Sequence, residues 1–456
     1  MFVDFLMEVF EESKDKDAII WKDKSYSYQW LFDRVQYWQD RDKAQNVISG
    51  SVTVLEGDFT PNTIALLLSL IEHRCIIVPI TRSVSGERPS GYIEIAQGEV
   101  LITLGENDDP EYVQLPNSAN HAFYCQLRKQ NHPGLVLFTS GSTGKPKAAV
   151  HDFPALLEKF KVRRHSDRTI NFLPFDHWGG LNTLFHILSN AGTVVTVRER
   201  SPAEICRIIE RYKIEVLPAT PTFLNLLLLS EDYKRYDLSR LKTISYGTEP
   251  MPSGTLKRLK TLFPETRLHQ TYGLIELGVL RTKSKGDDSL WVKVGGEGYE
   301  TRVVDGMLQI KAKSAMLGYL NAPSPFTEDG WFKTGDVVEV EGEYLHILGR
   351  KSEIINVGGE KVYPVEVESV LQLMEGVEDA VVGAETSPIT GQIVVARVKL
   401  NTGESLSDFR KRMRAFCRDK LANYKIPQKV TLVDTVMHGE RFKKMRRELD
   451  KNGRPF

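Results

Sequence analysis

Charge of one sign and cysteine are both scarce in this sequence of 456 residues. Its 60 basic residues are balanced by 60 acidic ones, so we expect no broad attraction to nucleic acid or to an anionic membrane. The four cysteines lie far apart and form no C-x-x-C pair. This spacing argues against a zinc framework or a disulfide scaffold and favours a reduced, cytoplasmic setting.

A long apolar run is missing as well. No stretch reaches the roughly 18 apolar residues of a membrane-spanning helix. The segment 1–16 lacks the basic start and apolar run of a secretion signal. We therefore expect a cytoplasmic protein without a membrane partner. A chain of this length exceeds what one hydrophobic core usually supports, so two or more domains are expected.

Strand and helix patterns alternate over much of the chain. The segments 51–57, 63–74 and 75–80 read as strand, helix and strand, and the same order returns twice before residue 274. Such alternation is typical of parallel α/β units. Shorter β segments follow from about residue 290, and the chain ends in a smaller unit with mixed patterns.

These patterns predict an α/β protein of two unequal parts. We expect a large N-terminal α/β domain with mixed sheets at 1–348, a hinge at 349–353 and a small, mobile C-terminal α+β domain at 354–456. Strands that end in glycine or polar residues just before a helix place the chemistry at their carboxyl ends.

The stretch "FTSGSTGKPKAAVHD" at 138–152 concentrates glycines, hydroxyls and lysines directly after an apolar strand. It is not a Walker loop, because Thr139 stands where that motif needs glycine and Pro146 follows Lys145. It also lacks the G-x-G start of a dinucleotide fingerprint.

The chemistry of a phosphate cradle is nevertheless present. Glycines allow positive φ and let backbone N–H groups face an anion, hydroxyls add donors, and a lysine adds charge. A flexible surface loop is the alternative, but the strand that leads into the stretch favours function. The predicted polyphosphate ligands are Thr139, Ser140, Gly141, Ser142, Thr143, Gly144 and Lys147.

This loop resembles the signature loop of the adenylate-forming (AMP-binding) superfamily, which includes acyl- and aryl-CoA synthetases, luciferases and peptide-synthetase adenylation domains. The pattern there reads Tyr-Thr-Ser-Gly-Thr-Thr-Gly-x-Pro-Lys-Gly, and Phe138 to Lys147 follow it, with Ala148 in place of the last glycine. Four further stretches resemble motifs of the superfamily in the same order: "YGTEP" at 246–250, "QTYGLIE" at 270–276, "WFKTGD" at 331–336 and "LGRKSEIINVGGEKVYPVEVE" at 348–368.

The resemblance implies a role for each of these segments. It implies an α-phosphate contact at Thr271, magnesium at Glu276, ribose contacts at Asp336, and a ribose or phosphate contact at Arg350. Glycines 358 and 359 would border the path of a pantetheine arm. The nucleotide-binding residues so implied are Gly247, Thr248, Glu249, Pro250, Tyr272, Asp336 and Arg350; the pantetheine path is Gly358 and Gly359.

The superfamily carries a catalytic lysine near its C-terminus, in a segment such as Ser-Gly-Lys-x-x-Arg-Arg-Glu-Leu. The corresponding stretch here is "HGERFKKMRRELD" at 438–450, and aligning "RREL" places Lys443 at the catalytic position, within the small lid domain. Phe442 replaces the customary glycine, so Lys444 is a second candidate. A solvated basic helix start or an anion-binding patch is the alternative interpretation of this run.

"LPFDHWGGLNTLFH" at 173–186 aligns with the acyl-pocket motif of the superfamily, with His177 beside the substrate carboxylate. Trp178 stands where amino-acid-activating relatives carry an aspartate, which disfavours an ammonium-bearing substrate. Asp176 precedes His177, and a one-residue shift would restore amino acids as substrates. The predicted pocket residues are His177, Trp178, Phe223, Gly247 and Leu277, which suit an aryl or medium-sized acyl acid.

The resemblance therefore implies ATP-dependent adenylation of a carboxylic acid, giving acyl-AMP and pyrophosphate, followed by thioester formation. We expect an AMP-forming acid–thiol ligase, most simply an acid–CoA ligase for an aryl or fatty acid, with ATP, Mg²⁺ and CoA as cofactors. One alternative loads an acyl or peptidyl carrier protein through its phosphopantetheine. Another is a catalytically silent nucleotide-binding scaffold.

Overall fold

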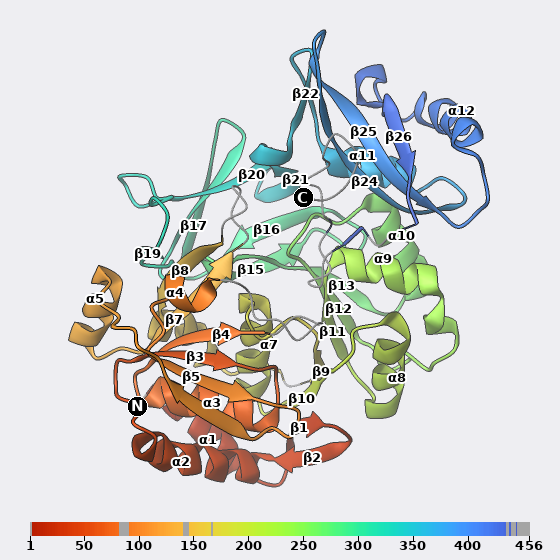
Figure 1. Ribbon diagram of the computed structural model, residues 1–456. Coiled ribbons are helices and arrows are strands. Elements are labelled where there is room, and N and C mark those ends of the chain that lie inside the picture. The colour runs from red at the N-terminus through yellow and green to blue at the C-terminus, as the bar shows by residue number, and fades with distance from the viewer. Residues whose placement is uncertain are drawn as a thin grey trace.

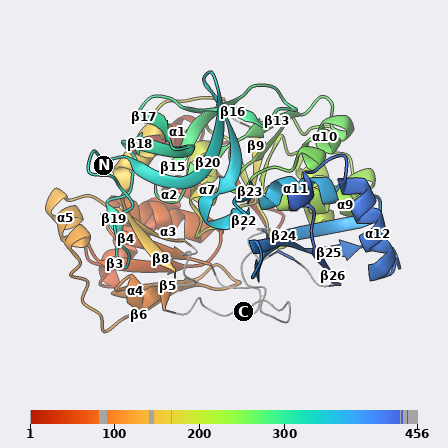
Figure 2. The ribbon, with the colours of Figure 1, turned by 90° about the horizontal axis from the view of Figure 1, so that it is seen from above.

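A computed structural model describes residues 2–81, 91–139, 146–165, 167–434, 437–438 and 444. It has a large N-terminal α/β domain and a smaller C-terminal domain, as predicted (Figure 1). The smaller domain lies beside α9 (Pro221–Ser230) and α10 (Ser253–Leu262) in both views (Figure 2). Within the described ranges, no helix combines the length and apolar character needed to cross a bilayer.

The first sheet of the large domain is parallel except at one edge. Its order is β13-β12-β11-β9-β10-β1-β2, with only β1 and β2 antiparallel. The strands are β1 (Asp17–Trp21), β2 (Lys24–Ser27), β9 (Arg168–Asn171), β10 (Thr193–Thr196), β11 (Val216–Ala219), β12 (Thr243–Tyr246) and β13 (Arg267–Gln270). The parallel strands all end at one edge, which is where α/β proteins bind ligands.

The second sheet carries the predicted phosphate loop between two of its strands. Its order is β19-β8-β7-β4-β3-β5-β6, and β7 and β8 form an antiparallel pair on either side of the loop. The strands are β3 (Val52–Glu56), β4 (Ile76–Ile80), β5 (Val100–Leu104), β6 (Pro110–Gln114), β7 (Gly134–Thr139), β8 (Lys147–Asp152) and β19 (Gly318–Tyr319).

The third sheet is antiparallel and begins earlier than the sequence suggested, at residue 272. Its order is β14-β15-β16-β21-β20-β18-β17. The strands are β14 (Tyr272–Leu274), β15 (Gly278–Ser284), β16 (Trp291–Gly295), β17 (Tyr299–Val304), β18 (Met307–Ala312), β20 (Phe332–Glu341) and β21 (Tyr344–Arg350).

The C-terminal domain has its own five-stranded sheet. The strands are β22 (Ile355–Val357), β23 (Glu360–Val362), β24 (Val377–Ser387), β25 (Gly391–Leu400) and β26 (Lys429–Leu432). Only a short 3₁₀ helix, η3 (Lys351–Glu353), and Ile354 separate β21 from β22. The predicted hinge at 349–353 therefore covers the end of β21 and η3, and rotation about it stays a prediction.

The helices cover these sheets and supply much of the core. The remaining helices of the large domain are α1 (Asp4–Glu12), α2 (Tyr28–Ala44), α3 (Pro61–Glu72), α4 (Tyr92–Ile95), α5 (Ala122–Gln130), α6 (Phe153–Leu157), η1 (Glu158–Phe160), α7 (Trp178–Ser189), α8 (Pro202–Tyr212) and η2 (Asp232–Lys234). Those of the small domain are α11 (Pro364–Leu371), α12 (Leu406–Cys417) and η4 (Asn423–Lys425). The helix α12 ends at Cys417, and η4 leads into Ile426, which is held extended before Pro427.

Helix starts in the large domain use one repeated device. The hydroxyls of Thr60, Ser201 and Thr220 each accept a hydrogen bond from the backbone N–H three residues later, and a proline follows each cap. This device starts α3, α8 and α9, and in α9 it directly follows the end of β11. Buried apolar side chains of α3 and α7 then join the first two sheets in one core cluster.

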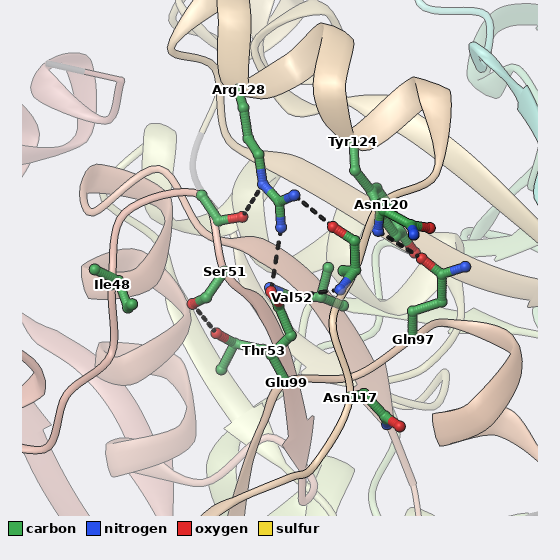
Figure 3. A network of polar contacts seen from close by, with 12 residues as sticks. Ile48, Ser51, Val52, Thr53, Gln97, Glu99, Asn117, Asn120, Tyr124 and Arg128 are labelled. Carbon is green, nitrogen blue, oxygen red and sulfur yellow. Dashed lines mark hydrogen bonds and ion pairs between the residues drawn. The ribbon is translucent and has the colours of Figure 1, made fainter.

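A charged network ties α5 to the second sheet (Figure 3). Arg128 donates to the carbonyl of Gly50 (2.8 Å), to the carbonyl of Ala119 (2.5 Å) and to Glu99 Oε2 (3.2 Å). Glu99 in turn accepts the backbone N–H groups of Val52 and Ala119. Such charge-assisted bonds fix the helix against the sheet.

Candidate functional site

The predicted nucleotide-binding segment at 246–250 and the predicted α-phosphate contact at Thr271 meet at the carboxyl edge of the first sheet. β12 and β13 are parallel, with Tyr246 paired to Gln270, so the residues that follow them are neighbours. Thr271 donates to the Tyr246 carbonyl from its backbone N–H (2.7 Å) and from Oγ1 (3.0 Å). A Cβ on Gly247 would stand only 2.3 Å from Thr271 Oγ1. Only glycine allows this approach of the two segments.

The rest of the 246–250 segment is held rigidly. Thr248 has φ +73°, a left-handed conformation that is uncommon for a residue with a Cβ. Glu249 Oε1 accepts the backbone N–H of Thr222, at the start of α9 (2.9 Å). Pro250 follows directly in the chain. The segment therefore links the end of β12 to the beginning of α9.

Several buried polar atoms around this edge have no hydrogen-bond partner among the described residues. They are Thr248 Oγ1, the side-chain amide of Asn171 at the end of β9, Gln270 Oε1 at the end of β13 and Trp178 Nε1 at the start of α7. A buried polar group without a partner costs about 1–3 kcal/mol. Their concentration at one sheet edge indicates a site that a polar ligand completes.

The predicted ribose residues form one compact network. Asp336 on β20 faces Arg350 on β21, and the two are direct cross-strand partners. Arg350 Nε lies 2.8 Å from Asp336 Oδ1, and the Tyr272 hydroxyl donates to Oδ2 at 2.5 Å. Burial raises the pKa of Asp336, and Arg350 acts in the opposite direction. Burial and then Asp336 raise the pKa of the Tyr272 hydroxyl, which stays protonated as a donor.

The predicted metal ligand lies next to the end of the phosphate loop. Glu276 Oε1 accepts a hydrogen bond from the Tyr319 hydroxyl (2.5 Å), and Lys147 Nζ lies 5.4 Å from the centre of the Tyr319 ring. Asn321 accepts from the backbone N–H of Ala148 (3.0 Å) and so ties down the start of β8. β8, β19 and Glu276 are thereby brought together.

Tyr319 and Asn321 were not identified from the sequence. They act through β19, a two-residue strand that pairs with β8 across about 170 positions of the chain. A strand of two residues is too short to show a hydrophobic pattern. The only available signal was the polar–aromatic Gly-Tyr-Leu-Asn stretch itself.

Magnesium fits the chemistry of this corner. The described residues contain no group of three or more His, Cys, Asp or Glu side chains placed to hold a metal ion. Magnesium commonly uses one or two protein carboxylates and takes its other ligands from substrate phosphates and water. Glu276, beside the phosphate loop, supplies such a carboxylate.

The acyl-pocket residues have more than one structural role. His177 is the N-cap of α7, where its Nδ1 accepts the backbone N–H of Gly179 (3.0 Å). Trp178 is buried, and its Nε1 lies 3.2 Å from the position of a Cβ on Gly278. Phe223 and Leu277 are fully buried in two different core clusters. Packing alone accounts for these last two, and their contact with substrate stays a prediction.

The two glycines of the predicted pantetheine path form the turn between β22 and β23. Gly358 has φ +61° and Gly359 φ +94°, so the turn itself requires glycine. A Cβ on Gly359 would meet no atom within 4 Å. The space beside the turn is therefore open.

Some predicted residues lie outside the described part of the chain. These are Ser140, Gly141, Ser142, Thr143, Gly144 and Lys443; the flanking Thr139 and Lys147 are paired across β7 and β8. Lys444, the other candidate for the catalytic lysine, is described. Its Nζ donates to the Ala380 carbonyl (2.7 Å) and lies 3.2 Å from Asp379 and 3.5 Å from Glu368. Lys444 is thus committed to the interior of the small domain.

Two protein-family profiles match this chain. The profile described as "AMP-binding enzyme" matches residues 6–320, and "AMP-binding enzyme C-terminal domain" matches 366–443. A CoA ligase for a substituted propanoyl group from Rhodococcus jostii (strain RHA1) is 30% identical over 66% of this chain, which spans 61% of that relative's length. The 2-succinylbenzoate–CoA ligase of Bacillus subtilis (strain 168) is 24% identical over 98% of this chain and 97% of its own.

Solved structures agree on the fold. The anthranilate CoA ligase AuaEII, in complex with anthranoyl-AMP, superposes with a TM-score of 0.81 at 20% identity, covering 98% of this chain and 95% of its own. The profile matches extend over most of the chain and include the segments around Gly247, Thr271 and Glu276, whereas Asp336 and Arg350 lie between the two matches. This protein belongs to the AMP-binding enzyme family.

Proposed function

We propose that this chain is an AMP-forming acid–CoA ligase acting on an aryl or fatty acid, with ATP, Mg²⁺ and CoA. The observation that carries the proposal is the contact of Glu276 with Tyr319, whose ring lies beside Lys147 at the end of the phosphate loop. This contact places a carboxylate that can bind a cation beside a loop that can bind phosphates. Names of relatives, including those for 2-succinylbenzoate and anthranilate, support a carboxylic acid substrate and favour an aryl acid.

The reaction has two steps. A carboxylate oxygen of the acid attacks the α-phosphorus of ATP, an O–P bond forms, and the bond to pyrophosphate breaks. The sulfur of CoA then attacks the acyl carbonyl, its proton is lost, and AMP leaves with the electron pair of the broken C–O bond. Both anions of the first step must be brought together, so neutralisation of charge around the phosphates is the main requirement.

The chain's own groups would meet that requirement as follows. Lys443 and Lys147 supply positive charge, and Thr271 contacts the α-phosphate beside Gly247. Glu276 would hold magnesium, which when bound neutralises phosphate charge. Asp336 and Arg350 orient the ribose, and His177 at the N-terminus of α7 lies beside the substrate carboxylate.

The test is pyrophosphate release with MgATP over benzoic, cinnamic, indole-acetic, fatty and amino acids, each with and without CoA. Release that depends on one acid class and turns over faster with CoA supports the ligase. Lys443→Ala serves as the inactive control.

The other outcomes separate the alternatives. Release that stalls near one equivalent with CoA present indicates a carrier-protein phosphopantetheine as the acceptor. ATP binding without release for any acid indicates a silent nucleotide-binding scaffold. Release with amino acids would indicate that the acyl-pocket motif is shifted by one residue, with Asp176 in the position that pairs with a substrate ammonium group.

A further inference from the structure

Glu276, the predicted cation ligand, is held at two points by one short stretch of chain, residues 316–319. Its backbone carbonyl accepts the N–H of Met316 (2.8 Å), and its Oε1 accepts the Tyr319 hydroxyl (2.5 Å). In the described part of the chain, the tyrosine therefore engages one oxygen of this carboxylate and leaves Oε2 for a cation. The main chain and the side chain of Glu276 thus depend on the same four residues.

The stretch that carries Tyr319 is itself fixed against the strand that leaves the phosphate loop. The backbone N–H groups that flank β19 donate to two carbonyls of β8, at 2.7 and 2.9 Å. The Phe123 ring of α5 packs so close to Gly318 that a Cβ there would stand 2.5 Å from Phe123 Cζ. Asn321 Nδ2 donates to the Pro146 carbonyl (2.8 Å) at the end of the loop. Tyr319 is therefore carried by a rigid support.

The ring of Tyr319 has a different neighbour from its hydroxyl. Lys147 Nζ lies 5.4 Å from the ring centre, within the range of a cation–π contact. Tyr319, Lys147 and Glu276 are each half-buried, so this corner is open to a ligand. A change that removes only the hydroxyl would separate the contact with the carboxylate from the contact with the loop.

We propose that Tyr319 is a positioning residue, which holds the Glu276 carboxylate in the orientation that binds magnesium. The inference rests on the proposed function, since it takes Glu276 as the carboxylate that binds the cation beside the phosphates. A glutamate side chain loses rotational freedom when it binds a ligand, and fixing it in advance removes part of that entropic cost. Hydrogen-bond partners of metal ligands typically contribute about 10- to 100-fold in metal affinity. In this role Tyr319 acts through Glu276 and contacts no reacting atom.

Equilibrium binding of a nucleotide tests this without requiring turnover. Calorimetry measures the Kd of α,β-methylene-ATP, which is not cleaved between its α- and β-phosphates, once with excess magnesium and once with EDTA. The Kd in EDTA divided by the Kd in magnesium is the magnesium enhancement, which reports how the bound cation and the nucleotide strengthen each other on the protein. Tyr319→Phe should reduce the enhancement at least about tenfold. Binding in EDTA should stay within twofold, because the Phe ring keeps the contact with Lys147.

A double-mutant cycle shows whether the hydroxyl acts through Glu276. Glu276→Gln should reduce the enhancement at least as much as Tyr319→Phe does. Adding Tyr319→Phe to Glu276→Gln should cause no further loss, as expected for two residues that work as one unit.

Tyr299→Phe is the matched control. The Tyr299 hydroxyl lies 3.0 Å from Ser314 Oγ, which donates to the carbonyl of Leu277, the residue after Glu276 (2.7 Å). The variant therefore removes a tyrosine hydroxyl from the support of the same segment without touching the carboxylate. It should leave the magnesium enhancement within twofold.

Four results would overturn the inference. One is an unchanged enhancement in Tyr319→Phe. Another is an equal loss in EDTA and in magnesium, which would make the hydroxyl a phosphate donor or a purely structural group. The third is an additive loss in the double variant. The fourth is full enhancement in Glu276→Gln, which would exclude this carboxylate as the cation ligand. Loss of the enhancement as expected, but without pyrophosphate release from any acid, would instead contradict the ligase proposal and leave the role of Tyr319 standing.

Discussion

Replacing Lys444 should destabilise the small domain, whereas replacing Lys443 should abolish adenylation. The Lys444 side chain is only 5% exposed, and its two carboxylate neighbours, Glu368 and Asp379, are 1% and 10% exposed. Removing one member of a buried ion network costs about 3–5 kcal/mol, because the partners stay buried and charged. Glu368 and Asp379 retain backbone donors from Val382 and Ala380, so we expect the lower end, about 3 kcal/mol, for Lys444→Ala.

Hydrogen exchange of the peptide covering β24 measures this loss, since that strand carries Asp379 and Ala380. Lys429→Ala is the matched control, as Lys429 forms an exposed pair with Glu385, and such pairs contribute at most about 1 kcal/mol. The combination of Lys444→Met, Glu368→Gln and Asp379→Asn removes all three charges and should recover most of the stability.

Adenylation assays on the same variants complete the comparison. Lys443→Ala should keep the exchange pattern of the unmodified chain and lose pyrophosphate release by at least a hundredfold. Lys444→Ala, assayed under conditions in which its small domain is folded, should retain far more activity than Lys443→Ala. If Lys444→Ala left β24 unchanged but abolished adenylation, both the register of the C-terminal segment and the reasoning from burial would be wrong.

Two further outcomes are expected. Gly247→Ala should lower pyrophosphate release at least tenfold, because the new Cβ would stand 2.3 Å from Thr271 Oγ1; steady-state kinetics checks this. Excess EDTA should stop pyrophosphate release and added magnesium should restore it, whereas unchanged release would remove the metal from the proposal.

The sequence was most informative where a motif follows a strand of the parallel sheet. Gly247 and Thr271 each come directly after such a strand. Because the strands were predicted to be parallel, both residues were expected at the same carboxyl edge of the sheet. Their contact is a consequence of parallel pairing between β12 and β13. For such residues, local pattern and global topology agree.

Contacts between side chains distant in sequence could not be predicted. Lys159 meets Val279 across 120 positions, and Lys444 meets Asp379 across 65. The sequence shows only a basic run around Lys444; nothing in that run reveals that α11 and β24 present carboxylates to it. Such pairings depend on how whole elements pack, for which periodicity carries no signal.

The network at Asp336 connects the proposed ribose site to the start of the small domain. Arg350 ends β21, η3 follows at once, and β22 already belongs to the second domain. Both oxygens of Asp336 are occupied, one by Arg350 and the other by the Tyr272 hydroxyl. A ribose bound at Asp336, as proposed, would share these oxygens with Arg350 and Tyr272, because an ionised carboxylate has about four acceptor sites. Each added donor would weaken the pair that anchors Arg350, and this would couple occupancy of the proposed nucleotide site to the predicted hinge segment.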